Sequence, residues 1–444
     1  MTSPEAAGGR DVAVNIARTQ SRENVPALTG LRFVAAFSVL IAHSADATLL
    51  SHETPWGIVY WLIQASGFGM TLFFVLSGFV IHYNYATLVT QGGRRGIATY
   101  LWARFARLYP LFLLMLSASV LASVRPAHML LGQFDRFRST LEALPWFLLS
   151  IQSWFYLPIG GSSLIYCLGG NASLSWSIST EWFFYFVFPG IALVILRSRS
   201  PWVTSVLAAL WCALWIAIST SLYDRSPSID VWAVERFGSV AGNANHHQDS
   251  FVRWLLYFSP YLRIGEFVLG AFVAQLYVQL LSRKVAAGEN LFGSAVFFAA
   301  AASVFLVSYL EYSPNVGMNV FRKMNMNFAL APSAALLIFC AARYRNLVSR
   351  LLNSRPAIVL GDASYSIYLI HFGVLTTVVW LGGSATHGVI FDSCKLALVM
   401  AAIVLLSIAL HRYYEAPARK WLRQFWGKRV TRAALAEAAQ SSTF

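Results

Sequence analysis

Ten apolar stretches of membrane-spanning length constrain this chain more than any other feature of its sequence. One helical crossing of a bilayer core needs about 20 predominantly apolar residues. Such stretches lie at residues 28–50, 58–83, 105–123, 176–196, 202–221, 252–281, 292–310, 326–342, 362–383 and 389–411. Because a backbone in lipid must satisfy its hydrogen bonds internally, the sequence predicts an all-α integral membrane protein with about ten transmembrane helices.

The composition also indicates that lipid is the solvent of this chain. Of its 444 residues, 57% are hydrophobic and 12% are charged, whereas soluble domains are about 45–50% apolar and about 25% charged. These values exclude a disordered chain and a conventional cytosolic enzyme. A further apolar stretch, 141–155, is shorter and is interrupted by Pro145, and we expect it to lie in the outer interface without crossing.

The connections between the stretches predict the orientation of the chain. With ten crossings, most of the 33 Lys and Arg residues fall on one side of the membrane. An additional crossing at 141–155 would reverse the sides of all later loops and remove this asymmetry. Since short basic loops stay in the cytoplasm, both termini are predicted to be cytoplasmic. The formal net charge of +14 is then explained by topology, and no basic face remains for DNA or RNA.

We expect three segments along the chain. Residues 1–27 are predicted to be a disordered cytoplasmic tail, residues 28–412 the transmembrane domain, and residues 413–444 a basic cytoplasmic tail. The last segment contains Trp421 and Trp426, so it is either an amphipathic surface helix or a plain positively charged flank. The four Cys residues have no CxxC spacing, and no metal site is expected.

Ionisable residues inside a membrane span are costly and are therefore candidates for function. In the first span, His43 follows Arg32 after three helical turns, which places both on one face about 16 Å apart. Asp46 lies one turn after His43, where a carboxylate can fix the tautomer of a proton-accepting imidazole. The alternative is that Arg32 extends to the inner headgroups and that His43 is a hydrogen-bonded core residue.

Two further spans carry candidates at comparable depths. Glu181 lies little more than one turn into the fourth span, and could form an acid/base pair with His43 or an ion pair between helices. Arg104 and Arg107 are predicted at the cytoplasmic start of the third span, where a helix N-terminus with two guanidinium groups suits phosphates. An ordinary charge anchor is the alternative for the two arginines.

The sixth and ninth spans hold the remaining polar groups. Arg263 and Glu266 share a helix face and are predicted to form a structural salt bridge. Ser364, Tyr368 and His371 form a polar stripe along the ninth span. Such a stripe indicates either ligand contact or hydrogen bonding between helices, and both alternatives stay open from the spacing.

Seven of these stretches together resemble, in order, the motifs of membrane-bound acyltransferase family 3, the bacterial O-acyltransferases that modify polysaccharides and antibiotics. They are Leu28-Thr29-Gly30-Leu31-Arg32 with His43, Leu72 to Phe79, the double Arg with Tyr109-Pro110, Trp176 to Ser179 with Glu181, Arg263 to Gly270, Ser364 to Tyr368 with His371, and Tyr414 to Arg419. The resemblance covers about residues 28 to 420. The chain departs from the family pattern at Thr71, Trp182 and Gly265, where Asp, Glu and Pro are common, and these departures concern the acceptor more than the activity.

The resemblance implies an acyl-CoA donor, usually acetyl-CoA, that binds from the cytoplasm. It implies that Arg32 and His43 are essential and that Arg104 and Arg107 assist donor binding. Ser364 and Tyr368 are further candidate donor contacts because of their polar stripe.

The sequence thus leads to one preferred function. We expect an O-acetyltransferase of the bacterial inner membrane that transfers acetyl from acetyl-CoA to a hydroxyl of a cell-envelope or secreted glycan. His43 would act as general base, or would first take the acyl group covalently. A small-molecule acceptor such as a macrolide is the second choice. A secondary transporter is the alternative from another class, although the chain lacks the two similar halves common in such proteins.

Overall fold

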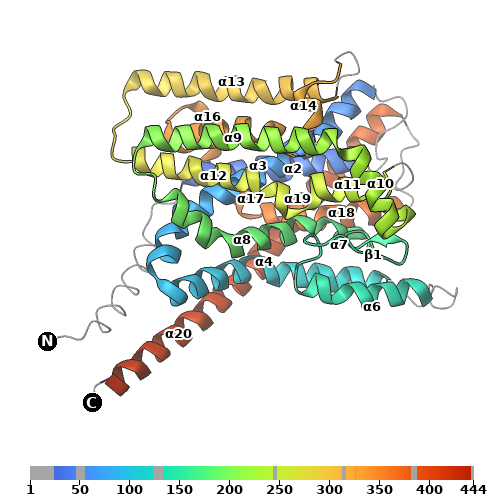
Figure 1. Ribbon diagram of the computed structural model, residues 1–444, viewed down its shortest axis with the longest axis horizontal. Coiled ribbons are helices and arrows are strands. Elements are labelled where there is room, and N and C mark those ends of the chain that lie inside the picture. The colour runs from blue at the N-terminus through green and yellow to red at the C-terminus, as the bar shows by residue number, and fades with distance from the viewer. Residues whose placement is uncertain are drawn as a thin grey trace.

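The computed structural model describes residues 25–46, 56–123, 134–243, 248–312, 317–325, 327–381 and 388–441. Long helices lie side by side in this part of the chain and form an elongated bundle (Figure 1). Strands β1 (Pro158–Ile159) and β2 (Ser162–Ser163) form a two-residue antiparallel hairpin and are the only strands in the described residues. The predicted helical class is therefore confirmed.

The helices divide into long apolar ones and shorter connecting ones. The first half of the chain contains α2 (Pro26–Asp46), α3 (Trp56–Gln91), α4 (Gly93–Ser123), α6 (Phe134–Leu148), α7 (Gly170–Leu174), α8 (Trp176–Ile195), α9 (Pro201–Asp224) and α10 (Ser226–Phe237). The second half contains α11 (Phe251–Arg253), α12 (Pro260–Leu280), α13 (Ala287–Tyr312), α14 (Val320–Lys323), α15 (Ala331–Arg343), α16 (Leu347–Leu352), α17 (Arg355–Asp362), α18 (Ser364–Trp380), α19 (Val389–Leu410) and α20 (Ala416–Ser441). Short 3₁₀ or π turns add η1 (Ser239–Ala241), η2 (Trp254–Phe258), η3 (Phe328–Leu330) and η4 (His411–Glu415).

Helices α3 and α12 form the centre of the bundle and approach each other closely. A Cβ atom on Gly78 of α3 would collide with the carbonyl oxygen of Phe267, and one on Gly270 of α12 would collide with that of Val75. Small residues allow such backbone contact between membrane helices, where packing and not hydrophobicity drives association. Gly361 of α17 meets α2 at Thr29 in the same way, which fixes the start of α2.

Eight helices in the described residues are long and apolar enough to cross a membrane, or nine if α17 and α18 are counted as one span bent by 60°. This number is smaller than the predicted ten. The missing one is the predicted span 326–342, which is a shorter apolar helix from Phe328 to Arg343. The segment from residue 319 to residue 345, which contains this helix, still extends along the whole of α13. At the end of α13, Asn319 Nδ2 donates to the Leu310 carbonyl over 2.9 Å, and at its start Arg345 N donates to Asn290 Oδ1 over 2.9 Å.

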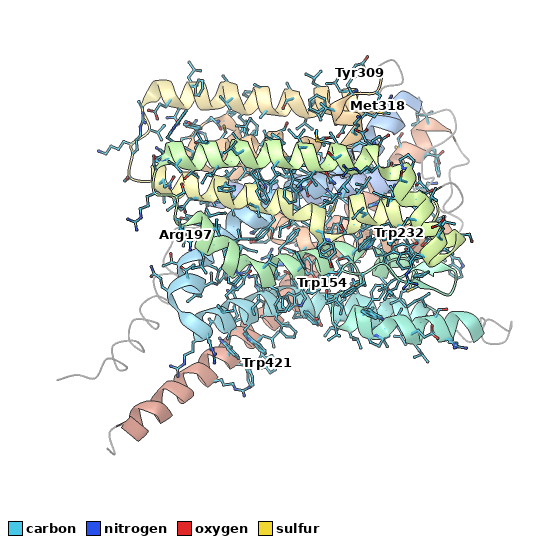
Figure 2. All side chains as sticks on the ribbon, viewed as in Figure 1. Trp154, Arg197, Trp232, Tyr309, Met318 and Trp421 are labelled. Atoms are coloured by element: carbon cyan, nitrogen blue, oxygen red, sulfur yellow. The ribbon has the colours of Figure 1, made fainter. Side chains whose placement is uncertain are left out.

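The stretch predicted to lie in the outer interface is not among the candidate spans. It forms the end of α6 and the loop that follows, and α6 lies at one end of the bundle (Figure 1). Arg197 is seen toward the other end, whereas Trp232 and Met318 lie near the end that α6 occupies (Figure 2). Tyr109 of α4 donates to the Leu148 carbonyl over 3.0 Å and thereby joins α4 to α6.

The C-terminal segment is helical through Ser441. Helix α20 leaves the bundle diagonally beside α4 (Figure 1). Trp102 of α4 stacks on Trp426 with ring centroids 5.1 Å apart, and its Nε1 donates to the Leu422 carbonyl over 2.9 Å. Helix α20 is therefore attached to the bundle over its first turns.

Candidate functional site

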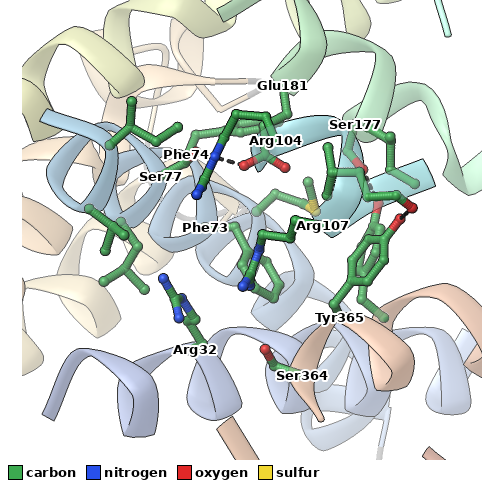
Figure 3. A pocket seen from close by; sticks show the side chains of 17 residues that line it. Arg32, Phe73, Phe74, Ser77, Arg104, Arg107, Ser177, Glu181, Ser364 and Tyr365 are labelled. Carbon is green, nitrogen blue, oxygen red and sulfur yellow. Dashed lines mark hydrogen bonds between the residues drawn. The ribbon is translucent and has the colours of Figure 1, made fainter. Parts of the chain in front are cut away.

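A cavity of about 80 Å³ lies where α2, α3, α4, α8 and α18 meet. It brings together six residues that the sequence singled out on four separate helices: Arg32, Arg104, Arg107, Glu181, Ser364 and Tyr368. Apolar side chains of α3, among them Met70 and Phe73, complete the wall. Figure 3 shows the arginine side chains of α2 and α4 directed into the same space as Glu181.

The two arginines of α4 reach the cavity from within the helix. The structure corrects the prediction that they mark the helix start, because α4 begins at Gly93 and Arg104 lies three turns farther along. Their attraction for anions therefore comes from the guanidinium charges and not from a helix N-terminus. The apolar stretch began near residue 105, but the polar turns before it continue the same helix.

Arg104 is the most deeply buried of the three cavity arginines, with 7% of its surface exposed. Its Nη2 donates to the Tyr85 hydroxyl over 2.7 Å, and its guanidinium carbon lies 4.5 Å from the centre of that ring. Its Nε has no hydrogen-bond partner within the described structure. A buried donor without a partner is costly, so this side of the cavity suits an acceptor from a ligand.

Glu181 is the only carboxylate among the described residues that line the cavity. It accepts a hydrogen bond from Ser77 Oγ over 2.7 Å. Neither Arg32 nor Arg107 forms a salt bridge in the described part of the chain. One carboxylate thus faces three guanidinium groups, which leaves the cavity positively charged.

A pair of histidines lies next to this cavity. His43 Nδ1 of α2 is 3.0 Å from His371 Nε2 of α18, and the two rings stack with centroids 5.1 Å apart. His371 Nδ1 is 2.6 Å from the Tyr368 carbonyl oxygen, which can only accept a hydrogen bond. His371 Nδ1 therefore carries the proton and donates it to this oxygen.

The hydrogen-bond network then assigns the tautomer of His43. With its proton on Nδ1, neutral His371 accepts at Nε2, so His43 donates from Nδ1. The lone pair of His43 is left on Nε2. A hydrogen bond from one ring nitrogen to a neighbouring acceptor thus fixes the tautomer of the other.

The structure pairs these candidates differently from the sequence-based expectation. His43 is hydrogen-bonded to His371 and Glu181 to Ser77, so the described hydrogen bonds do not join Glu181 to His43. Glu181 instead faces the arginines of the cavity. Asp46 ends α2, but its side chain lies outside the described residues.

Tyr368 connects the cavity with the histidine pair. Its side chain lines the cavity, and its hydroxyl lies 2.7 Å from Ser177 Oγ of α8. Its backbone carbonyl holds His371, one turn farther along α18. The polar stripe of α18 therefore contributes both to the cavity and to the contact between helices.

Two residues gained importance only from the structure. His371 was one member of a polar stripe, yet it is the hydrogen-bond partner of His43. Its position three residues after Tyr368 would have placed it near that carbonyl, but nothing in the spacing identifies His43 as the other partner. Tyr85, which holds Arg104, has no sequence signal among the many aromatic residues of this chain.

The predicted salt bridge of α12 is confirmed as a structural element. Arg263 Nη1 and Glu266 Oε1 are 3.0 Å apart, with only 2% and 0% of the two side chains exposed. Arg263 Nε donates to the Tyr257 carbonyl over 2.8 Å, and Thr71 Oγ1 donates to Glu266 Oε1 over 2.6 Å. Thr71, which replaces a common Asp, thus supplies a neutral donor to a buried carboxylate.

Comparison with known proteins gives consistent matches over most of the chain. A family described as an acyltransferase domain matches residues 25–412. Acyltransferase MdmB of Streptomyces mycarofaciens is 27% identical over 90% of this chain and 92% of its own length. No solved structure matches the chain.

Two other relatives are longer than the matched region. O-acetyltransferase OatA of Staphylococcus aureus is 22% identical over 89% of this chain and 57% of its own length. The putative peptidoglycan O-acetyltransferase YrhL of Bacillus subtilis is 23% identical over 93% of this chain and 58% of its own length. The chain therefore spans little more than half the length of these two proteins.

Proposed function

Because this chain belongs to the acyltransferase 3 family of membrane acyltransferases, we propose that it transfers an acetyl group from cytoplasmic acetyl-CoA to a hydroxyl of its acceptor. Family membership makes the protein an integral, multi-pass membrane enzyme and removes the secondary transporter from consideration. The donor, the acceptor and the roles of individual residues belong to the proposal.

The cationic cavity is the donor-binding part of the proposed site. Arg32, Arg104 and Arg107 would hold the phosphates of CoA, since guanidinium groups bind phosphate oxygens through paired hydrogen bonds. The observation that carries this assignment is the excess of positive charge around one cavity together with the unpartnered Nε of Arg104. Ser364 and Tyr368 would add polar contacts. A cavity of about 80 Å³ holds several water molecules, so the donor must displace side chains on binding.

The histidine pair is the reacting part of the proposed site. His43 Nε2 would take the proton of the acceptor hydroxyl while its oxygen attacks the thioester carbonyl carbon. The carbon–sulfur bond breaks, and the protonated His43 returns the proton to the leaving sulfur. His371 keeps His43 in the competent tautomer. An acyl group carried covalently on His43 remains the alternative route.

The proposed orientation brings a cytoplasmic donor to this cavity. With 319–345 counted as a crossing beside α13 and with α17 and α18 as one bent span, the chain crosses ten times and both termini are cytoplasmic. Arg197 and Arg283, which follow α8 and α12, then lie on the cytoplasmic side, as short basic loops require. We place the protein in the bacterial inner membrane on this basis and by its family.

The acceptor is proposed as a glycan of the cell envelope or a secreted glycan. One matched relative is named for peptidoglycan and another for O-acetyl transfer, which supports this class. A small hydroxylated molecule such as a macrolide is the second candidate.

Acetyl transfer can be followed in membrane vesicles. Radioactive acetyl-CoA is added on the cytoplasmic side, and label is measured in the glycan and small-molecule fractions for wild type and for His43→Ala. We expect label in one of the two fractions with wild type, and a loss of about 10²–10⁴-fold in the variant, as general-base catalysis typically contributes.

The distribution of label decides between the acceptors. Glycan label supports the first acceptor class, and label confined to small molecules replaces it with the second. Undiminished transfer by normally expressed His43→Ala would remove the histidine from the mechanism. If acetyl-CoA neither binds nor turns over, the assignment of acetyl-CoA as the donor is refuted.

A further inference from the structure

Helix α20 packs against the end of α4 that precedes the donor cavity. Trp426 stacks on Trp102 at 5.1 Å with an interplanar angle of 18°. Its Nε1 also donates to Thr99 Oγ1 over 3.3 Å, and Trp102 Nε1 donates to the Leu422 carbonyl over 2.9 Å. These contacts fix the rotation of α20 about its axis near residues 422–426.

The face of α20 that meets α4 also carries two arginines. Arg419, Arg423 and Trp426 follow one another at spacings of four and three residues, so they share one side of the helix. Arg419 interacts electrostatically with Arg107. Arg423 interacts with both Arg104 and Arg107 and also reaches the hydroxyl of Tyr85. Helix α20 therefore places two further guanidinium groups near Arg104 and Arg107, which line the cavity.

The Tyr85 hydroxyl stands between the two sets of arginines. It accepts a hydrogen bond from Arg104 Nη2 over 2.7 Å and also interacts with Arg423 of α20. The Tyr85 hydroxyl thus lies close to arginines of both α4 and α20. Like charges this close repel one another, and a multiply charged anion would relieve the repulsion.

The nearby carboxylates Glu181, Glu415 and Asp362 balance only part of the charge of these arginines. Glu181 accepts from Ser77, and Glu415 Oε2 is held by Ser366 over 2.9 Å and by His411 over 3.0 Å. Asp362 is exposed. In the described part of the chain, none of the five arginines at residues 32, 104, 107, 419 and 423 forms a salt bridge.

We propose that α20 is part of the donor-binding site and that Arg419 and Arg423, together with Arg104 and Arg107, bind the phosphate groups of the nucleotide part of the acyl donor. This inference rests on the proposed use of acyl-CoA. It extends the proposed site to α20, which follows the 25–412 match to the acyltransferase family and begins within the last motif of the resemblance, Tyr414 to Arg419. The C-terminal segment, for which the sequence left an amphipathic surface helix or a basic flank open, becomes a binding element.

Phosphate chemistry could also come from a lipid headgroup. Trp421 and Phe425 of α20 are exposed, with 66% and 49% of their surfaces accessible, and such aromatic residues suit the membrane interface. The nucleotide is favoured because Arg419 and Arg423 face the side of α20 that meets α4, where Arg104 and Arg107 line the donor cavity.

The test measures CoA binding to the full-length protein in nanodiscs of phosphatidylcholine. The variant Arg419→Gln/Arg423→Gln is compared with Lys420→Gln/Lys428→Gln, which removes the same charge from exposed positions of the same helix. We expect the arginine variant to bind CoA about tenfold more weakly, as two charge-assisted contacts would allow. The lysine variant should stay within about twofold of wild type, in the range of exposed charges.

Pantetheine and anionic lipid complete the experiment. Pantetheine carries no phosphate, so its affinity should be equal in wild type and in the arginine variant. Equal CoA affinity in the arginine and lysine variants would overturn the inference. A difference in CoA affinity between the two variants that appears only after phosphatidylglycerol is added would also overturn it, because the arginines would then bind lipid.

A further variant separates this inference from the proposed function. If Arg104→Gln/Arg107→Gln weakens CoA binding and the α20 variant does not, the donor site stands without α20. If wild type does not bind CoA at all, the proposed donor and this inference both fail.

Discussion

Replacement of His371 tests whether the histidine pair works as a unit. In the resting enzyme, His43 Nδ1–H donates to His371 Nε2 over 3.0 Å as a neutral hydrogen bond, which contributes about 1 kcal/mol. When His43 takes the acceptor's proton it becomes cationic, and the same bond then contributes about 1.5–3 kcal/mol. The difference of roughly 0.5–2 kcal/mol is available only in the transition state, and 1.36 kcal/mol corresponds to about tenfold in rate.

We therefore expect His371→Leu to lower kcat about tenfold while the KM for acetyl-CoA stays near its wild-type value. Leucine removes the nitrogen that accepts the hydrogen bond from His43 Nδ1, so nothing at this position holds the His43 tautomer. Glutamine at the same position offers a side-chain oxygen that can accept from His43 Nδ1, so His371→Gln should recover part of the loss. The assay is initial rate of acetyl transfer in vesicles against acetyl-CoA concentration.

Thermal unfolding of the purified variants is the control for this comparison. His371 is fully buried, so a lower melting temperature is expected for both substitutions, whereas only the leucine variant should lose most of the rate. Wild-type kcat in His371→Leu would refute the hydrogen-bonded pair. An increase in KM at unchanged kcat would move His371 from the reacting part of the site to donor binding.

The donor cavity and the buried ion pair give two further predictions. Arg104→Gln/Arg107→Gln should raise the KM for acetyl-CoA more than it lowers kcat, because the lost contacts bind the donor equally before and during reaction. Steady-state kinetics measure both constants, and a fall in kcat larger than the rise in KM would contradict the prediction. Arg263→Met should destabilise the protein by about 3–5 kcal/mol by leaving the Glu266 charge buried alone. Unfolding should show a smaller loss for Arg263→Met/Glu266→Leu, and equal losses would contradict the argument.

The sequence predicted well those features that depend on a single helix. Arg32 and Glu181 lie within apolar segments where charge is expensive, Arg104 lies directly before one, and the structure places all three on one cavity. The Arg263–Glu266 pair was predictable because both partners lie within one turn of the same helix.

Features that depend on packing between helices could not be predicted. The bond from His43 to His371 joins residues 328 positions apart, and no periodicity encodes that pairing. The start of α4 at Gly93 was hidden because hydropathy detects the lipid-facing part of a helix and not its polar extension. The segment 326–342 was predicted as one helix of full length, whereas the structure has a shorter apolar helix there, because buried irregular backbone can also be apolar.

Tyr368 determines how closely the two halves of the site can be coupled. Its hydroxyl contacts Ser177 and donates to the Leu174 carbonyl over 3.0 Å, which fixes α18 against the start of α8. Its own carbonyl holds His371 at 2.6 Å, and His371 holds His43. A donor that displaces the Tyr368 side chain from the cavity wall therefore acts on the same residue that positions the general base. In the proposed mechanism, donor binding and the orientation of His43 would then be linked through the short stretch of α18 from Tyr368 to His371.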